Sequence, residues 1–249
     1  MNPSDLVLFF EDRSGEVNAY LDFLEELQKA TQGGVPRLAG TEYRITALQQ
    51  KILYSSVYLQ LYNLVEATIT QSLEAVAKAA EETGAWQPHQ LSEQLHREWV
   101  RAMARTHSDM APENRLKFAL QLSDHLFNQL PIAGFNIEVG GGGNWDDESI
   151  FQIGKRLGCL LQLSPEALKM AKKKMRDDLG PLKLVKDRRN GLAHGSISFV
   201  SCADGLDFAE LHEMAQSVIS YLGEVVTCFA DYVISYGFLR PEARPAGGA

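Results

Sequence analysis

The residues best suited to chemistry lie in one segment, Asp187–Gly195. It places a guanidinium, a carboxamide and an imidazole, those of Arg189, Asn190 and His194, at the C-terminal end of an expected helix that Gly195 terminates. A helix C-terminus carries partial negative charge, which stabilises an imidazolium, and an arginine can hold a phosphate through two hydrogen bonds. An acid–base group beside a fixed cation can cleave a phosphodiester without a metal.

The spacing of these residues places the side chains of Arg189 and His194 on different faces of the expected helix. Asn190 and His194 are four residues apart and share a face, whereas Arg189 and His194 are five apart, about 140° around an ideal helix. Either Arg189 reaches around the helix, or a second copy of the chain completes the site, so we expect a homodimer. In the simplest alternative, His194 only caps its own helix.

The segment that leads into this motif is strongly basic. Residues 169–189 contain nine lysines and arginines against three aspartates, a local charge of +6 in a chain whose net charge is −8. The rest of the chain therefore carries −14. Such an island can attract a polyanion to one place, although a charge run of this kind can also be an ordinary solvated helix face.

Apolar residues recur at helical spacing throughout the chain, and no stretch shows the alternation of a half-buried strand, so the fold class is predicted to be all-α. The second helix, expected from a Thr41 cap to about Glu82, would be about 60 Å long or kinked. The last helix is expected from an Asp207 cap to about Leu239. The other expected helices begin near residues 4 or 14, 88, 112, 146 or 147, 165 and 182.

The chain is expected to form one domain, residues 1–249, because no composition shift divides it. Two shorter helices, within about 88–130, resemble an insertion in a simpler bundle, and residues 240–249 are expected to be a flexible tail. The run Gly140–Gly143 is interpreted as a hinge or spacer, because no strand precedes it and no Gly-Lys-Ser/Thr follows, as a phosphate-binding loop would require.

The sequence offers no metal or cofactor motif. The three cysteines, Cys159, Cys202 and Cys228, lie far apart, and the histidines lack the i, i+4 spacing of metal ligands, so we expect neither a metal nor another cofactor. The pair Arg101 and His107 lacks both a polar residue after the arginine and a glycine after the histidine. We interpret it as a surface helix pair.

No membrane segment is expected. Charged residues flank the apolar run near the N-terminus, which argues against a signal peptide. Glu224 and Asp231 interrupt the most apolar stretch, Val218–Leu239, which is therefore interpreted as a core helix. The absence of a disulfide pattern favours a reducing compartment, and the cytoplasm is the expected location.

The hexapeptide Arg189–His194 resembles the signature of the HEPN superfamily, in which four to six residues separate an arginine from a histidine and a polar residue commonly follows the arginine. The run Tyr58–Ala67 is similar to the family's early helix, where Asn or Glu interrupts an apolar face. The resemblance covers roughly 41–82 and 146–239. It implies a helical bundle with long second and last helices.

The resemblance further implies a metal-independent endoribonuclease of the toxin, phage-defence or RNA-processing kind, acting as a dimer and held in check by an antitoxin or a defence-system partner. The RNA 2′-hydroxyl would attack the adjacent phosphate, with His194 as general acid or base and Arg189 on the scissile phosphate, while Asn190 orients the histidine or the phosphate. Residues expected to hold the RNA backbone are Arg188, Lys186, Lys183, Lys172, Lys173 and Lys174.

Two upstream features have open interpretations. Glu66, alone on the apolar face of the second helix, either hydrogen-bonds the motif arginine or helps to build the cleft, or it belongs to a buried structural ion pair. Tyr54, Tyr58 and Tyr62 recur every four residues and are interpreted as helix packing rather than a base-stacking platform. Two alternatives to the nuclease stay open: a non-catalytic HEPN module that binds RNA, nucleotide or protein, and a helical interaction protein whose motif is accidental.

Overall fold

The computed structural model describes residues 3–82, 86–106, 109–139 and 144–245. Within these ranges the chain forms helices and no strand longer than an isolated bridge, so the all-α prediction is confirmed. The α-helices are α1 (Pro3–Gln32), α2 (Ala47–Glu82), α3 (Glu93–Met103), α4 (Pro112–Phe127), α5 (Asp147–Leu157), α6 (Pro165–Lys172), α7 (Pro181–Ala193), α8 (Phe199–Cys202) and α9 (Phe208–Ile234). Short 3-10 helices cover Pro88–Gln90, Arg176–Asp178 and Pro241–Ala243.

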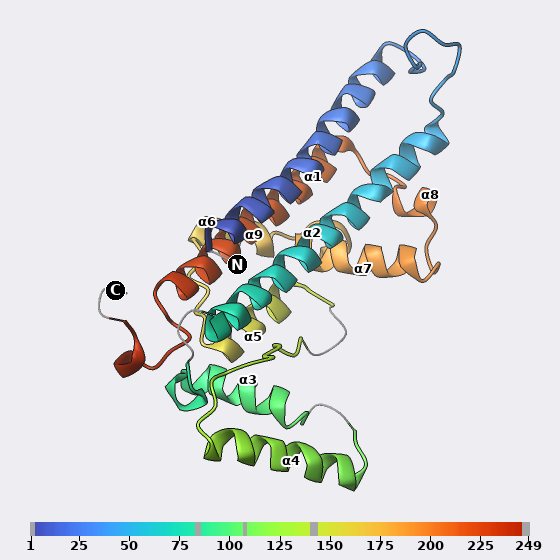
Figure 1. Cartoon of the computed structure of the whole chain (residues 1–249). Helices are drawn as coiled ribbons and strands as arrows, with labels where there is room; N and C mark the ends of the chain where they lie inside the picture. Colours follow the sequence, from blue (N-terminus) through green and yellow to red (C-terminus); the bar gives the residue numbers. More distant parts are fainter. Residues whose placement is uncertain (1–2, 83–85, 107–108, 140–143, 246–249) are drawn as a thin grey trace.

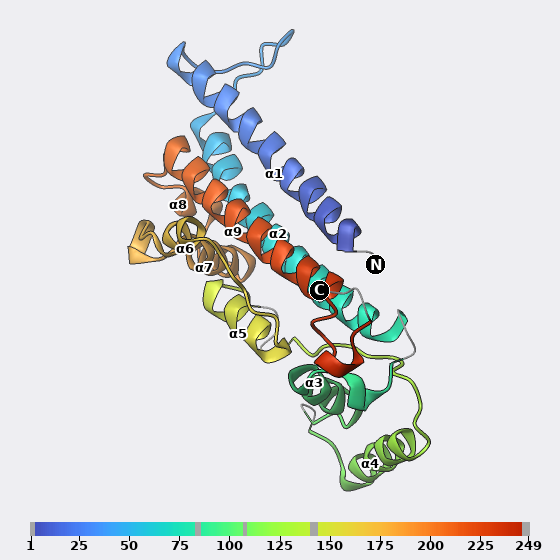
Figure 2. The ribbon, with the colours of Figure 1, turned by 90° about the vertical axis from the view of Figure 1, so that its left-hand side faces the viewer.

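Three long helices, α1, α2 and α9, lie side by side and form the main bundle (Figures 1 and 2). Helix α9 runs parallel to α2 and antiparallel to α1. On α1 the buried side chains recur every three or four residues, which is the spacing that turns one helix face to a core. These buried α1 residues are Leu6, Phe10, Ser14, Val17, Leu21, Leu24 and Leu27.

Helix α9 is the apolar centre of the bundle. Among the described residues it is the one helix long and apolar enough to cross a membrane, and 56% of its most apolar window is buried in the structure. Burial against α1, α2 and α6 explains its composition, because a helix that is apolar nearly all round needs neighbours on most sides. The structure is consistent with a soluble protein, as the interpretation of this stretch as a core helix predicts.

Helix α2 starts five residues later than predicted. Thr46 rather than Thr41 caps it, because the Thr46 hydroxyl accepts from the Gln49 amide at 3.2 Å and the Gln49 side chain accepts from the Thr46 amide at 2.8 Å. This reciprocal pair is a capping box. From there α2 continues unbroken for 36 residues, about 54 Å, so it spans the molecule without a kink.

The helix starts near the candidate site follow the predicted caps. Asp146 caps α5 and forms a capping box with Ser149, Ser164 caps α6, and Asp207 caps α9. Helices α7 and α8 pack against α2, and α6 packs against α9. The sequence that carries the Arg–His motif is thereby fixed to the middle of the longest helix (Figure 1).

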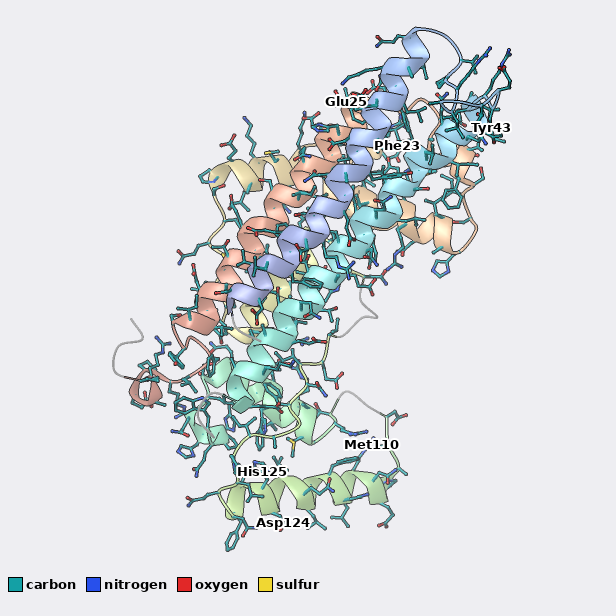
Figure 3. The ribbon with its side chains drawn as sticks, turned by 45° about the horizontal axis from the view of Figure 1, so that its top comes forward. Phe23, Glu25, Tyr43, Met110, Asp124 and His125 are labelled. Carbon is teal, nitrogen blue, oxygen red and sulfur yellow. The ribbon has the colours of Figure 1, made fainter. Side chains whose placement is uncertain are left out.

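At the end of the bundle farthest from the α1–α2 connection, α3 packs against α5, and α4 packs outside α3 (Figures 1 and 2). The helix predicted from Pro88 is divided, because Ser92 caps a new helix after the 3-10 turn. Of the α4 side chains only His125 is buried. Its ring lies 5.1 Å from that of Trp99, and Figure 3 shows it on the side of α4 that faces α3.

The last helix ends at Ile234 and not near Leu239 as predicted. Tyr236 has a positive φ of 53°, and a Cβ on Gly237 would lie 2.5 Å from the Tyr232 ring, so only glycine fits the turn. The chain then folds back, buries Phe238 and forms an isolated bridge between Leu239 and Leu91. The predicted spacer Gly140–Gly143, His107 of the Arg101–His107 pair and the last four residues of the tail lie outside the described residues.

Candidate functional site

The Arg–His motif occupies the end of α7. Pro181 starts this helix and Leu192 is buried near its end, so the motif's apolar residues face the bundle. His194 is the C-cap residue, and Gly195 follows in the left-handed region at φ 70°. The predicted helix end at Gly195 is confirmed, and the polar residues of the motif lie at the edge of the bundle.

The side chain of Arg189 is held on three sides. Its guanidinium carbon lies 3.5 Å above the centre of the Tyr62 ring, Nη2 lies 3.4 Å from Glu66 Oε2, and Nη1 donates to Asn190 Oδ1 at 2.9 Å. Tyr62 and Glu66 are four residues apart, on one face of α2. Of the two interpretations of Glu66, the structure favours the bond to the motif arginine, since this ion pair is not buried: half of the Glu66 side chain is exposed.

Asn190 extends the site toward the start of α5. Its Nδ2 donates to Asn144 Oδ1 at 3.2 Å, and the neighbouring Trp145 amide donates to the Tyr62 hydroxyl at 3.3 Å. Burial raises the pKa of Tyr62, so the phenol stays protonated at neutral pH and can donate as well as accept. The segment before α5 therefore forms a second wall beside Arg189.

His194 is exposed at the far end of the motif. Its backbone N–H donates to the Asn190 carbonyl at 3.0 Å, while its imidazole has no hydrogen bond or ion pair with any described residue. The side chains of Arg189 and Asn190 thus contact each other, whereas the imidazole of His194 contacts neither of them. A ligand or a second protein copy can reach the imidazole without breaking an existing contact.

Gly191 gives the motif its compact end, a role that the sequence did not indicate. The Gly191 carbonyl accepts from the amides of Ser196 and Ile197, and a Cβ on Gly191 would lie 2.7 Å from Ile197 Cγ2. The chain after His194 therefore folds directly over the glycine. Glycine at position 191 therefore lets the 196–197 segment pack closely against the end of α7.

The basic segment 169–189 meets counter-charges in the folded chain. Lys186 pairs with Asp146, Lys172 with Asp147, and Arg176 with Glu210 at 2.9 Å. The remaining pairs are Lys173–Glu213, Lys174–Asp178, Lys183–Asp187 and Arg188–Asp177. Several of the paired acids lie outside the segment, on α5 and α9, so the +6 counted along the sequence overstates the local charge. The exposed pairs among these, Lys173–Glu213, Lys174–Asp178 and Lys183–Asp187, contribute little and can exchange partners with a phosphate, whereas Lys186–Asp146 is largely buried.

Three residues join the site that sequence reasoning did not assign to it. Tyr62, interpreted from its spacing as helix packing, is buried and also supports Arg189. Asn144 contacts Asn190, and Asp146 holds Lys186. Tyr62 and Glu66 share one helix face, which is a detectable signal, but nothing in the sequence links that face to α7. The described residues contain no group of three or more histidine, cysteine or acidic side chains placed to hold a metal.

Comparison with known proteins identifies the family. The sequence model of the HEPN_MAE_28990-like HEPN family matches residues 5–238, which is nearly the whole chain and includes both α2 and the Arg–His motif. The chain therefore belongs to this HEPN family, and the resemblance drawn from the hexapeptide is confirmed. Neither the curated proteins nor the solved structures contain a match to the chain.

Proposed function

We propose that this HEPN protein is a metal-independent endoribonuclease of the toxin or phage-defence type, acting in the cytoplasm at a composite site formed by two copies of the chain. The observation that carries the proposal is the motif's geometry. Arg189 is fixed between Tyr62, Glu66 and Asn190, and a solvent-accessible His194 follows at the end of the same helix. Membership of the HEPN family supports the same nucleotide-directed chemistry.

In the proposed reaction the RNA 2′-hydroxyl attacks its own 3′-phosphate, which leaves a 2′,3′-cyclic phosphate and a 5′-hydroxyl. His194 of one copy takes the proton from the 2′-hydroxyl, and His194 of the other donates a proton to the leaving 5′-oxygen. Arg189 neutralises the charge that develops on the phosphate, and it can leave the half-exposed Glu66 to do so. Asn190 fixes Arg189 or the phosphate through its amide.

The test is cleavage of end-labelled RNA by purified protein in EDTA across pH 5 to 8. The wild type is expected to yield fragments ending in a cyclic phosphate, and His194→Ala is expected to leave the RNA intact. Because the imidazole makes no described contact, this substitution should not unfold the protein. His89→Ala, which removes another exposed histidine, is the matched control and should cleave normally. Equal results for wild type and His194→Ala would end the catalytic proposal.

A non-catalytic binding module is the second candidate, and one observation favours it. In the single chain Arg189 is already occupied by Glu66 and Asn190 and does not meet His194. The module would bind RNA, nucleotide or a protein such as an antitoxin without cutting. Binding that persists in the absence of cleavage, and that weakens when Lys172, Lys173 and Lys174 are changed to alanine, would favour this candidate.

A further inference from the structure

A second basic surface lies away from the motif, where α3, α5 and the segment after α9 converge (Figure 2). Two adjoining pockets of about 520 and 540 Å³ share Gln94 and Lys155 along their boundary. Their walls contain two acidic residues, Glu93 and Glu98, against six basic ones. The basic residues are Arg97, Arg101, Lys155, Arg156, Arg240 and Arg244, and we call the pair of pockets the basic groove. The groove carries a local charge of +4 in a chain of net charge −8.

The first pocket is built around one shared carboxylate. Glu98 is 2% exposed, and its Oε1 lies 3.0 Å from Arg101 Nη1 and 3.2 Å from Arg156 Nε. Glu98 alone cannot neutralise both guanidiniums. Glu138 adds a negative charge near Arg156, so the partly exposed Arg101 guanidinium is the one that keeps positive charge at the mouth of the pocket. Arg97 lies beside it and, among the residues that the structure describes, pairs with Glu93 alone, in an exposed contact at 2.7 Å that a phosphate can displace.

The second pocket presents guanidiniums that are positioned but not neutralised. Arg240 donates from Nε to the Leu91 carbonyl at 3.2 Å, and Arg244 donates from Nε to the Leu239 carbonyl at 3.3 Å. These bonds fix each side chain and leave the terminal amino groups free to donate. Within the described ranges neither arginine has an acidic partner, and the same holds for Lys155.

Helix α5 connects the groove to the candidate catalytic residues. At its start Asp146 binds Lys186 of α7 and Asn144 contacts Asn190. At its end Gly158 lies against Gln94 of α3, in the basic groove. Helix α5 has eleven residues, so its two ends lie about 16 Å apart. A short run of nucleotides can span this distance.

We propose that the basic groove binds the sugar–phosphate backbone of the RNA strand whose scissile phosphate lies at Arg189. The inference rests on the proposed function and adds a substrate requirement to it. A strand long enough to occupy both places binds more tightly than a dinucleotide, which can occupy only the motif. The phosphate contacts made in the groove are independent of base sequence and release counterions, so they make binding depend on salt.

The experiment measures binding of a labelled single-stranded RNA by fluorescence anisotropy at several salt concentrations, in the His194→Ala background to prevent cleavage. The groove variant carries Arg97→Ala, Lys155→Ala and Arg240→Ala, all at exposed side chains. Loss of three phosphate contacts should weaken binding and reduce the slope of log affinity against log salt by about two. The control variant, Lys29→Ala, Arg37→Ala and Arg44→Ala, makes the same change in net charge around the α1–α2 connection and should match the parent.

Cleavage separates this inference from the proposed function. With His194 intact, the groove variant should cut a dinucleotide as fast as wild type and cut the long strand more slowly. If the wild type cuts RNA but the groove and control variants behave alike, the groove proposal is wrong and the nuclease stands. If the groove variant loses only binding of inorganic phosphate, measured by calorimetry, the groove is a small-anion site and the proposal fails. Without RNA binding or cleavage by the wild type, both proposals fail.

Discussion

At the scale of single residues, the site is defined by how Arg189 is held rather than by the spacing of arginine and histidine. The ring of Tyr62 supports the flat guanidinium face while Glu66 and Asn190 bind its edge. A planar cation with several fixed donors suits both contacts, and a lysine ammonium on a flexible stem does not. His194 needs no such support, because its exposed position lets the substrate or a second chain provide the contacts.

Arg189→Lys should therefore lower the rate of RNA cleavage by about a hundredfold, since it keeps the charge but loses the stacked, two-pronged geometry. Initial rates on the end-labelled RNA measure the effect. Arg188→Lys is the control on the same helix and should stay within a few-fold of wild type, because Arg188 pairs with Asp177 and a lysine keeps the positive charge that a backbone phosphate contact needs. Wild-type cleavage by Arg189→Lys would show that Arg189 acts only as a charge.

At the scale of elements, the start of α5 is tied to the middle of α7. Asp146 caps α5 through the Ser149 amide and binds the Lys186 ammonium, and both side chains of the ion pair are 16% exposed. Burial raises the pKa of Asp146, but the hydrogen bonds from Lys186 and Ser149 outweigh that effect, so the pKa lies below its ordinary value of 3.8. The carboxylate thus stabilises the docking of one helix on another.

The pH dependence of Asp146→Asn tests this link. A carboxyl group whose pKa is lowered by folding stabilises the native state fully above its unfolded pKa, and that contribution is lost as the pH falls through the lowered value. Asparagine still caps the helix but cannot pair with Lys186, so the variant should lose about 1–2 kcal/mol of unfolding free energy at neutral pH.

Urea unfolding should show this difference shrinking toward zero as the pH falls below 3.8. Asp204→Asn is the control, since Asp204 is 61% exposed in its contact with Lys51 and should change little at any pH. A deficit of equal size at neutral and acidic pH would mean that the Asp146 side chain acts by packing and not by its charge.

A pair of glycines tests how closely α6 and α7 approach. A Cβ on Gly180 would lie 2.6 Å from the backbone oxygen of Ala171, so Gly180→Ala should cost about 1–3 kcal/mol by forcing the helices apart. Gly15 is exposed within α1, and a Cβ added there would meet no atom within 4 Å, so Gly15→Ala should stabilise by about 0.5–1 kcal/mol. Thermal unfolding should show a lower midpoint for Gly180→Ala and a higher one for Gly15→Ala, and an unchanged or higher midpoint for Gly180→Ala would contradict the close approach.

At the scale of the whole molecule, the three-helix bundle supports α7, which carries the motif, on one side, and α3 lies at one end (Figures 1 and 2). The basic groove is lined by residues of α3, α5 and the segment after α9. The single chain holds Arg189 but leaves His194 apart from it. A second copy that brings another Arg189 and His194 next to the motif would complete the catalytic site. Assembly is therefore a requirement of the proposed mechanism.

Mixing complementary inactive chains tests this requirement. Arg189→Ala and His194→Ala should each be inactive alone. Mixing them should restore a small part of the cleavage, because a mixed dimer retains one arginine and one histidine on different chains, while water must replace the second histidine. Sedimentation should show a species of twice the 27.7 kDa chain mass. A strictly monomeric wild type that still cleaves RNA would place the whole site in one chain and exclude the composite arrangement.

The helical class, most helix boundaries and the composition of the motif could be predicted from the sequence, because caps, glycine stops and apolar spacing depend on neighbours within four or five residues. Asp146, Ser164 and Gly195 were found in this way, whereas Thr41 lost to the stronger capping pair at Thr46. Local signals of this kind act before the helices pack, so they can be recognised without a tertiary structure.

The residues that surround the motif could be identified only from the tertiary structure. Tyr62 meets Arg189 across 127 positions of sequence, the lysines before α7 acquire partners from α5 and α9, and the arginines of α3 join those beyond α9. These contacts depend on which helix faces dock and in what register. Many alternative dockings satisfy the same apolar spacing, so charge counted along the chain could not show where positive charge remains on the folded surface.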